Sequence, residues 1–364
     1  MSARETPAVR SVLVVANRLS GQGRGHDTAA AAVARLAARG VEVTEVRADS
    51  AAESVRLVRD ALADPQARPG VVVCVGGDGL VCVLLDALAH AGVPLGLVPS
   101  GTGNDLARAL GVPTDDTAAA VDLLLRGRTA VMDLGQITAP GAAPMWFATV
   151  AGTGFDARVT LRANRMRWPR GPLRYTVAAL AEITGGIGLP YRIELSGIAP
   201  GALDNPAADG AFDTDAVMVA IGNTRTYGGG MLICPDAESD DGLLDVTVVG
   251  AVSRLEMLRF LPALSAGKRV DHPAVRQYRA AEVTLNSPGA PAPPHREPAG
   301  PHPKTARGVP PGRPVVGARA GQYARGRRSN GLFFTLHCRR WDELIAAMAD
   351  AAPAVAASVV IVDR

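Results

Sequence analysis

Short apolar runs alternate with helical patterns through residues 10–130, and this alternation restricts the fold more than any other feature of the sequence. The strand-like runs are Val12–Val15, Val41–Val46, Val71–Val75 and Leu95–Val98. The helical patterns among them are 27–38, 51–62 and 80–89. Strands and helices in this order form a mostly parallel sheet that helices cover on both faces. Because ligands of such sheets bind beyond the carboxyl ends of the strands, we expect a binding site there.

The pattern changes after Arg128, where strand-like runs are separated by long turns. These runs lie at 130–137, 146–151, 191–195, 216–221, 244–249 and 281–285. Helical patterns interrupt them at 176–183 and 255–264. Strands connected in this way predict a second, β-rich domain that is mainly antiparallel.

Proline and arginine dominate the chain from Ser287 to Arg328, and apolar alternation is missing there. Proline lacks the N–H that a central strand must donate, so we predict that 287–364 is a poorly ordered, atypical tail that supplies no closing strand. One short helix fits residues 341–350. A shifted reading frame in a GC-rich gene would produce this excess of Pro, Arg, Gly and Ala, and we hypothesise that the ending is frame-altered.

Composition excludes several classes of protein. Of the 364 residues 48% are hydrophobic, which is enough to bury a core and excludes wholesale disorder. The net charge of +3 predicts no nucleic-acid partner. No apolar stretch approaches the roughly 18 residues that span a bilayer. The four cysteines are far apart and lack metal-binding spacing, so we expect reduced thiols in a cytoplasmic protein without a transmembrane segment.

The motif Gly76-Gly77-Asp78-Gly79 stands between a buried strand and a helix. Its glycines allow positive φ and let backbone N–H groups approach a phosphate, while the start of the helix adds partial positive charge. The glycines alone fit a tight turn equally well. Asp78 favours the phosphate interpretation, because a carboxylate among such amides is useful when Mg²⁺ or a hydroxyl proton is its partner.

A second loop, Ser100–Asp105, repeats this arrangement after the next strand and opens a helix over 106–110. Alone it fits a helix start with Asn104 or Asp105 as N-cap. Two such loops after neighbouring strands converge on one crevice, and the loop Asn17–Gly23 would form a third wall. Neither a Walker lysine loop nor a dinucleotide fingerprint is present, so backbone amides and arginines must hold the phosphates.

These motifs, in this order, resemble those of the bacterial diacylglycerol kinases and of their sphingosine and ceramide kinase relatives. The matching stretches are Gly76–Gly79, Pro99–Arg108, Asp133–Gly135, Ala151–Ala157, Tyr227–Gly230, Cys234–Ala237 and Asp240–Val246. The resemblance covers residues 10–285 and implies an NAD kinase/diacylglycerol kinase-like fold. It implies an α/β nucleotide-binding catalytic domain over 1–128 and a β-sandwich domain for the lipid substrate over 129–286, with the active site between them.

The resemblance also implies site residues. The implied nucleotide contacts are Asn17, Ser20, Gly21, Gly76, Gly77, Asp78, Gly79, Leu80, Val81, Cys82, Ser100, Gly101, Thr102 and Asn104. A Mg²⁺ ion held partly by main-chain oxygens is implied at Glu238, Asp241 and Leu243, and a simple turn fits Asp241-Gly242 as well. The implied catalytic carboxylates are Asp78, Asp105 and Glu297. Glu297 would be the general base, although His295 and Arg296 stand where the family has the Asp and Gly of an Asp-Gly-Glu turn.

The implied reaction transfers the γ-phosphoryl group of ATP to the primary hydroxyl of diacylglycerol or a related lipid and gives phosphatidic acid. Such an enzyme would be cytoplasmic and peripheral at the inner face of the membrane, as a monomer or a homodimer. Two alternatives stay open. The departure at His295 and Arg296 favours a weakened pseudo-kinase that binds nucleotide or lipid. The shared Gly-Gly-Asp-Gly motif favours an NAD kinase-like enzyme with a small soluble substrate.

Overall fold

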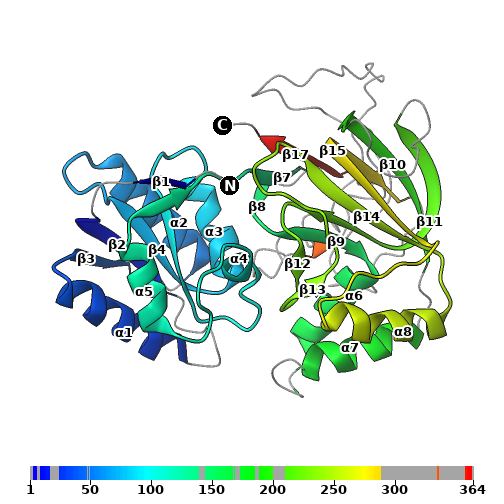
Figure 1. The fold of residues 1–364 in the computed structure, drawn as a ribbon, viewed down its shortest axis with the longest axis horizontal. Helices are drawn as coiled ribbons and strands as arrows, with labels where there is room; N and C mark the ends of the chain where they lie inside the picture. Colours follow the sequence, from blue (N-terminus) through cyan, green and yellow to red (C-terminus); the bar gives the residue numbers. More distant parts are fainter. Residues whose placement is uncertain are drawn as a thin grey trace, which may run out of the picture.

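A computed structural model of the chain shows two halves side by side, each built around its own sheet (Figure 1). It describes residues 3–5, 9–16, 24–46, 48, 50–138, 144–166, 168, 173–184, 188–199, 210–287, 334–335 and 357–362. The first half contains the parallel sheet, and the second half contains the antiparallel one. Among the described residues no helix is both long enough and apolar enough to cross a bilayer.

The parallel sheet has the strand order β3-β2-β4-β5. Its strands are β2 (Ser11–Ala16), β3 (Glu42–Val46), β4 (Val71–Gly76) and β5 (Leu95–Pro99). The helices of this half are α1 (Arg24–Ala38), α2 (Ala51–Ala63), α3 (Asp78–Leu88), α4 (Asp105–Ala109) and α5 (Thr117–Leu125). The predicted alternation is confirmed, and α5 is an addition to it.

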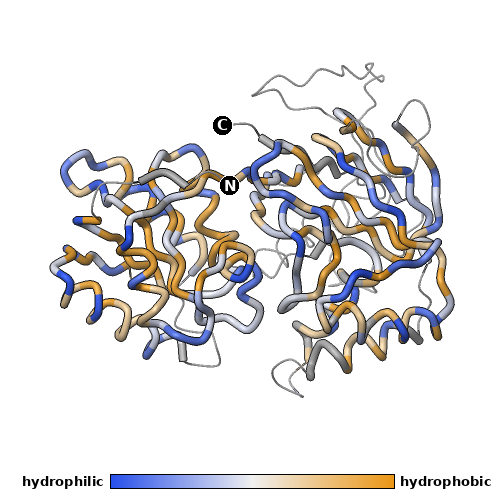
Figure 2. The backbone as a smooth tube through the Cα atoms, in the orientation of Figure 1, coloured by the Kyte–Doolittle hydropathy of each residue, from blue (hydrophilic) through white to orange (hydrophobic). Residues whose placement is uncertain are grey.

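Alternate residues of the central strands face opposite helical layers. Val12 and Val14 of β2 pack with Leu36 of α1, whereas Leu13 and Val15 belong to the core that holds α2 and α3. A strand covered on both faces must be apolar at every position, which explains the continuous valine runs. Figure 2 shows this apolar character along the central strands of both halves.

The second half contains one nine-stranded sheet in which every pairing is antiparallel. Its strands are β7 (Leu134–Thr138), β8 (Met145–Phe147), β9 (Val150–Gly154), β10 (Leu189–Ile198), β11 (Ala211–Gly222), β14 (Leu244–Gly250), β15 (Val275–Asn286), β16 (Phe334–Thr335) and β17 (Ala357–Val362). Strands β10 and β14 each pair with both β11 and β15, so the sheet closes on itself around a buried core. The predicted mainly antiparallel second half is confirmed.

Three helices cover the outer side of this sheet: α6 (Phe155–Arg165), α7 (Leu173–Thr184) and α8 (Arg254–Ser265). They bury small or apolar residues such as Ala163, Ala178 and Met257 against β11 and β14. A capping box starts α8, because the Ser253 hydroxyl accepts from the Glu256 N–H and the Glu256 carboxylate accepts from the Ser253 N–H.

Two small two-stranded elements complete the fold. Strand β1 (Ala3–Glu5) pairs with β6 (Arg128–Ala130). Strands β12 (Thr226–Tyr227) and β13 (Met231–Leu232) form a hairpin that lies against α4. The ring of His90, which follows α3, meets the ring of Trp146 in β8 edge-on, with 5.6 Å between their centroids. The two halves therefore contact each other through α4 with the hairpin and through α3 with β8.

The prediction that the tail supplies no closing strand is wrong. Strand β17 lies between β15 and β7 and pairs with both, so residues 357–362 belong to the same sheet as 134–138 and 275–286. Strand β16 adds to the edge next to β9. These residues are Ala-Ser-Val-Val-Ile-Val, a β-branched run that can fill the place between two strands. Most of the Pro/Arg-rich segment and the helix expected at 341–350 lie outside the described residues.

Candidate functional site

The two loops that follow β4 and β5 touch each other through their backbones. The Ser100 N–H donates to the Gly76 carbonyl at 2.9 Å. A Cβ added to Gly101 would lie 2.5 Å from the Gly77 Cα, and one added to Gly77 would lie 2.9 Å from the Gly101 Cα. Real Cβ atoms essentially never come this close to a backbone carbon, so the contact requires glycine on both sides. The predicted convergence of the two loops is confirmed.

One of the two expected reasons for the glycines, a positive φ, is wrong. Gly77 has a φ of −109°, and neither Gly76 nor Gly79 has a positive φ. Gly77 is the N-cap of α3, which starts at Asp78, two residues earlier than predicted. The loop therefore needs glycine for close approach and has no left-handed residue at these positions.

Asp78 links the first loop to the start of α4. Its two carboxylate oxygens accept the N–H groups of Asp105 and Leu106, each at 3.0 Å. The expected side-chain cap from Asn104 or Asp105 is not made. Asn104 occupies the N-cap position of α4 with a φ of +55°, and its side chain instead exchanges two 3.0 Å hydrogen bonds with Gly101. Asp78 thus caps α4 from the neighbouring loop.

Asp105 links the same loop to the second half of the molecule. Its buried carboxylate accepts the N–H groups of Gly229 and Gly230, both at 2.8 Å. These two glycines and Gly228 have φ values of 93°, 109° and 62°, so the turn between β12 and β13 has a left-handed backbone that favours glycine. We call this contact between Asp105 and the glycine turn the interdomain clasp. The sequence contains the motif Tyr227–Gly230, but nothing in the sequence predicts that its glycines contact Asp105.

The starts of the two helices differ in their capacity for an anion. Asp78 already fills the N-terminus of α4, whereas α3 has no side-chain cap at Gly77. The first N–H groups of α3, at Gly77, Asp78 and Gly79, precede any intrahelical acceptor. The start of α3 is therefore the better of the two positions for a phosphate.

The other implied nucleotide contacts lie in different surroundings. The core contains the buried side chains of Leu80, Val81 and Cys82. The Leu80 and Val81 N–H groups donate to the Gly77 carbonyl, at 3.0 and 3.2 Å. Thr102 is exposed at the crest of the second loop. Asn17, Ser20, Gly21 and Glu297 lie outside the described residues.

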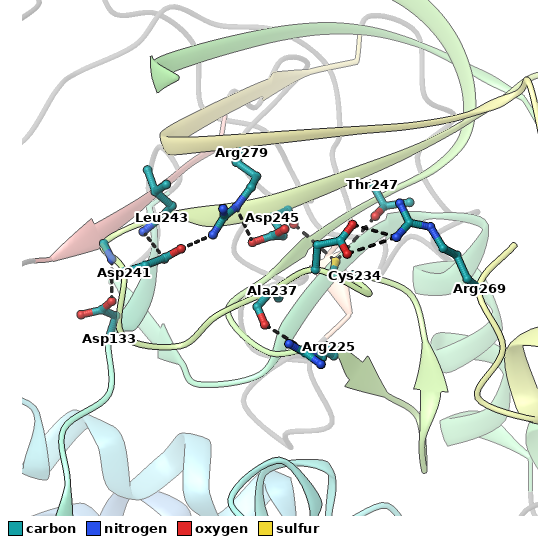
Figure 3. A network of polar contacts seen from close by, with 12 residues as sticks. Asp133, Arg225, Cys234, Ala237, Asp241, Leu243, Asp245, Thr247, Arg269 and Arg279 are labelled. Atoms are coloured by element: carbon teal, nitrogen blue, oxygen red, sulfur yellow. Dashed lines mark hydrogen bonds and ion pairs between the residues drawn. The ribbon is translucent and has the colours of Figure 1, made fainter. Parts of the chain in front are cut away.

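Two of the residues implied for Mg²⁺, Asp241 and Leu243, belong to a polar network in the second half (Figure 3), and the charge of Glu238 acts on Asp241. Asp241 pairs with Arg279 and accepts the Leu243 N–H at 3.0 Å. Asp245 lies on the other side of the same guanidinium, with its Oδ2 3.4 Å from the Arg279 Nε. Burial raises the pKa of Asp245 to about 6, against the opposing effect of Arg279.

This network does not form a metal cage from side chains. Burial, more than the neighbouring charges of Glu238 and Asp133, raises the pKa of Asp241. Within the described part of the chain no three Asp, Glu, His or Cys side chains are grouped so that they could hold a metal ion. A Mg²⁺ ion at Glu238, Asp241 and Leu243 would need main-chain or substrate oxygens to complete its ligands, and Arg279 already occupies Asp241.

Asn223 holds the chain segments that lead into the second half. It is fully buried, and its Nδ2 donates to the carbonyls of Asp133 at 2.8 Å and Ala148 at 3.1 Å. The Asp133 carboxylate in turn accepts the Gly242 N–H at 2.8 Å. Asn223 therefore fixes the segment before β7 against the loop between β8 and β9.

Replacing Asn223 with leucine is expected to lower the free energy of unfolding by about 2 to 4 kcal/mol, because two buried carbonyls lose their partner. Urea denaturation with an unchanged m-value measures this loss. Thr224→Val is the matched control, since the Thr224 hydroxyl is buried without a hydrogen-bond partner among the described residues and its removal should cost nothing. Equal stability of the two variants would contradict the assigned role.

Comparison with known proteins gives matches along most of the chain. The family "Diacylglycerol kinase catalytic domain" matches residues 11–137, and "YegS C-terminal NAD kinase beta sandwich-like domain" matches residues 149–316. A protein of Mycobacterium tuberculosis (strain ATCC 25618 / H37Rv) named "Diacylglycerol kinase" is 42% identical over 281 residues, which are 77% of this chain and 86% of that protein. A protein of Stenotrophomonas maltophilia (strain K279a) named "Probable lipid kinase YegS-like" is 34% identical over 241 residues, which are 64% of this chain and 72% of that protein.

Solved structures show the same fold. The crystal structure of a diacylglycerol kinase from Bacillus anthracis str. Sterne superposes with a TM-score of 0.53 at 20% sequence identity. The superposition covers 78% of this chain and 88% of that one. It supports the arrangement of an α/β half with a parallel sheet beside a β-sandwich-like half.

Proposed function

This chain belongs to the diacylglycerol kinase family of lipid kinases, and we propose that it transfers the γ-phosphoryl group of ATP to the primary hydroxyl of diacylglycerol or a related lipid. Phosphatidic acid would be the product with diacylglycerol. The observation that carries the proposal is the pair of touching loops, with an uncapped helix start at α3 and the clasp that joins them to the second half. Phosphoryl transfer depends mostly on positioning and charge stabilisation, which these features can supply.

The residues of the site would divide the work between binding and positioning. The N–H groups at the start of α3 would bind the phosphates of the nucleotide. Asp78 would hold the second loop against the first, and Asp105 would hold the lipid-binding half against both. Both carboxylates already accept two backbone N–H groups each, so we assign them positioning roles.

The proton of the lipid hydroxyl needs a separate acceptor. Glu297, aligned with the acidic turn of the family, is our proposed general base. Mg²⁺, when bound with the nucleotide, would neutralise phosphate charge. We propose ATP as the donor because the family consists of kinases, and a membrane lipid as acceptor because the relatives are named for lipid phosphorylation.

Transfer of labelled γ-phosphate to diacylglycerol in mixed micelles tests the proposal. We expect a labelled product that migrates with phosphatidic acid, formed more slowly than the roughly 1 to 100 per second of ordinary kinases because of the departure at the acidic turn. Parallel reactions with sphingosine and with NAD as acceptors identify the substrate class. Binding of ATP without transfer to any acceptor would contradict the proposal and identify a nucleotide-binding pseudo-kinase.

A further inference from the structure

Exposed apolar side chains gather on one layer of the molecule. Of the six large apolar side chains that are exposed within the described part of the chain, five belong to the α6–α8 region. They are Trp168, Val177, Leu180, Leu255 and Leu258, whereas Val131 lies elsewhere. Trp168 is 82% exposed and Leu255 59%, which is far more than a core position allows. Clustered apolar exposure of this kind marks a surface that meets another apolar partner.

The helices of this layer bury one face and expose another. In α7, Ala178 and Ala179 pack inward while Val177 and Leu180 face outward. In α8, Met257 packs inward while Leu255 and Leu258 face outward. Helices α7 and α8 contact each other and lie side by side along the lower edge of the second half in Figure 1. We call the outward side of α7 and α8 the helical face.

The charge of these helices favours an anionic partner. Helices α6, α7 and α8 contain six arginines and three acidic residues, a net charge of +3. This equals the net charge of the whole chain, so the rest of the chain carries no net charge. Two acidic side chains of the layer are already paired: Glu182 with Arg158 and Arg162, and Glu256 with the Ser253 N–H. Arg254 and Arg259 are exposed beside the two leucines of α8.

We propose that the helical face docks on an anionic lipid bilayer, with Leu255 and Leu258 entering the headgroup region and Arg254 and Arg259 pairing with lipid phosphates. Leucines flanked by arginines on an outward helix side are the combination that an interfacial helix uses. The inference rests on the proposed lipid kinase function, and it adds the surface through which the substrate is reached.

The helical face lies next to the candidate site. Helix α8 contacts β13, the strand that follows the glycine turn of the interdomain clasp. Just beyond α8, a Cβ added to Gly267 would lie 3.8 Å from the Gly230 carbonyl oxygen. A bilayer held on α8 would therefore be brought close to the turn that Asp105 holds, and so to the loops that would bind the nucleotide.

Vesicle co-sedimentation of the full chain tests the proposal without ATP or diacylglycerol. The probe is a vesicle of equal parts phosphatidylglycerol and phosphatidylcholine, compared with phosphatidylcholine alone. We expect binding to the anionic vesicles only. The variant Arg254→Gln with Arg259→Gln should weaken it about 25-fold, since each arginine near such a surface contributes about fivefold. Leu255→Gln with Leu258→Gln should weaken it at least about tenfold. Val131→Gln, an exposed apolar residue outside the face, is the matched control and should bind like the parent.

A second measurement separates this proposal from the proposed function. All variants should phosphorylate a short-chain, water-soluble diacylglycerol at the parent rate, because the helical face is not part of the reacting site. No transfer to this lipid by the parent would overturn the kinase function, whereas unchanged vesicle binding by both double variants would overturn the docking surface. A parent that sediments as a dimer and becomes monomeric on Leu255→Gln with Leu258→Gln would also overturn it, by assigning the face to a second copy of the chain.

Discussion

Replacing Asp105 with asparagine is expected to lower the rate of phosphoryl transfer about 100-fold while ATP still binds, since a misplacement of about 1 Å in a site costs this much. The Asp105 carboxylate accepts the N–H groups of Gly229 and Gly230, each at 2.8 Å. An asparagine offers one accepting oxygen, and its NH₂ group would face the second N–H, donor against donor. The clasp would open on one side, and the second half would lose its fixed position over the nucleotide loops.

Steady-state kinetics with varied ATP and lipid measure this effect, and we expect kcat to fall with little change in KM for ATP. Gly229→Ala should give the same pattern, because alanine is strained at a φ of 93° and weakens the clasp without touching a carboxylate. Asp60→Asn, which alters an exposed ion pair with Arg56, is the control and should match the parent. If Asp105→Asn loses activity while Gly229→Ala keeps the parent rate, Asp105 takes part in the chemistry and its positioning role is wrong.

Local patterns were sufficient to predict the elements of the first half. The run Val71–Val75 has no polar residue, as expected of a strand that is buried on both faces. In the structure it forms the central strand β4. Helix α2 followed from apolar residues at helical spacing, and the structure buries Val55, Val58 and Leu62. The convergence of the two loops followed from the parallel order of their strands.

Long-range partners could not be predicted in the same way. Asp78 was expected to face a metal ion or a hydroxyl proton, and its capping of α4 was not predicted, because which donors a carboxylate meets depends on the packing of two loops. The clasp joins residues 124 and 125 positions apart. Strand β17 lies between β15 and β7. Its six residues are typical of a strand, but the Pro/Arg-rich composition of the preceding segment favoured the prediction of a poorly ordered tail.

The backbone contact between Gly77 and Gly101 holds the two loops together. Replacing Gly101 with alanine is expected to weaken ATP binding at least about 100-fold and to lower the free energy of unfolding by about 1 to 3 kcal/mol, the usual cost of forcing an extra carbon into a packed site. The new Cβ would lie 2.5 Å from the Gly77 Cα and 2.8 Å from the Asn104 Oδ1. The Gly77 backbone leads directly into α3, so it cannot move aside without displacing the N–H groups that would hold the phosphates.

Gly77→Asp should abolish ATP binding for the same steric reason and, in addition, by placing a negative charge beside those N–H groups. Gly188→Ala is the matched control, because a Cβ there would meet nothing within 4 Å and the backbone is not left-handed. Calorimetric titration with Mg-ATP measures the affinity, and urea denaturation separates it from stability. Parent-like ATP affinity in Gly101→Ala would show that the nucleotide does not depend on the loop contact, and the phosphate site would then have to be sought away from the start of α3.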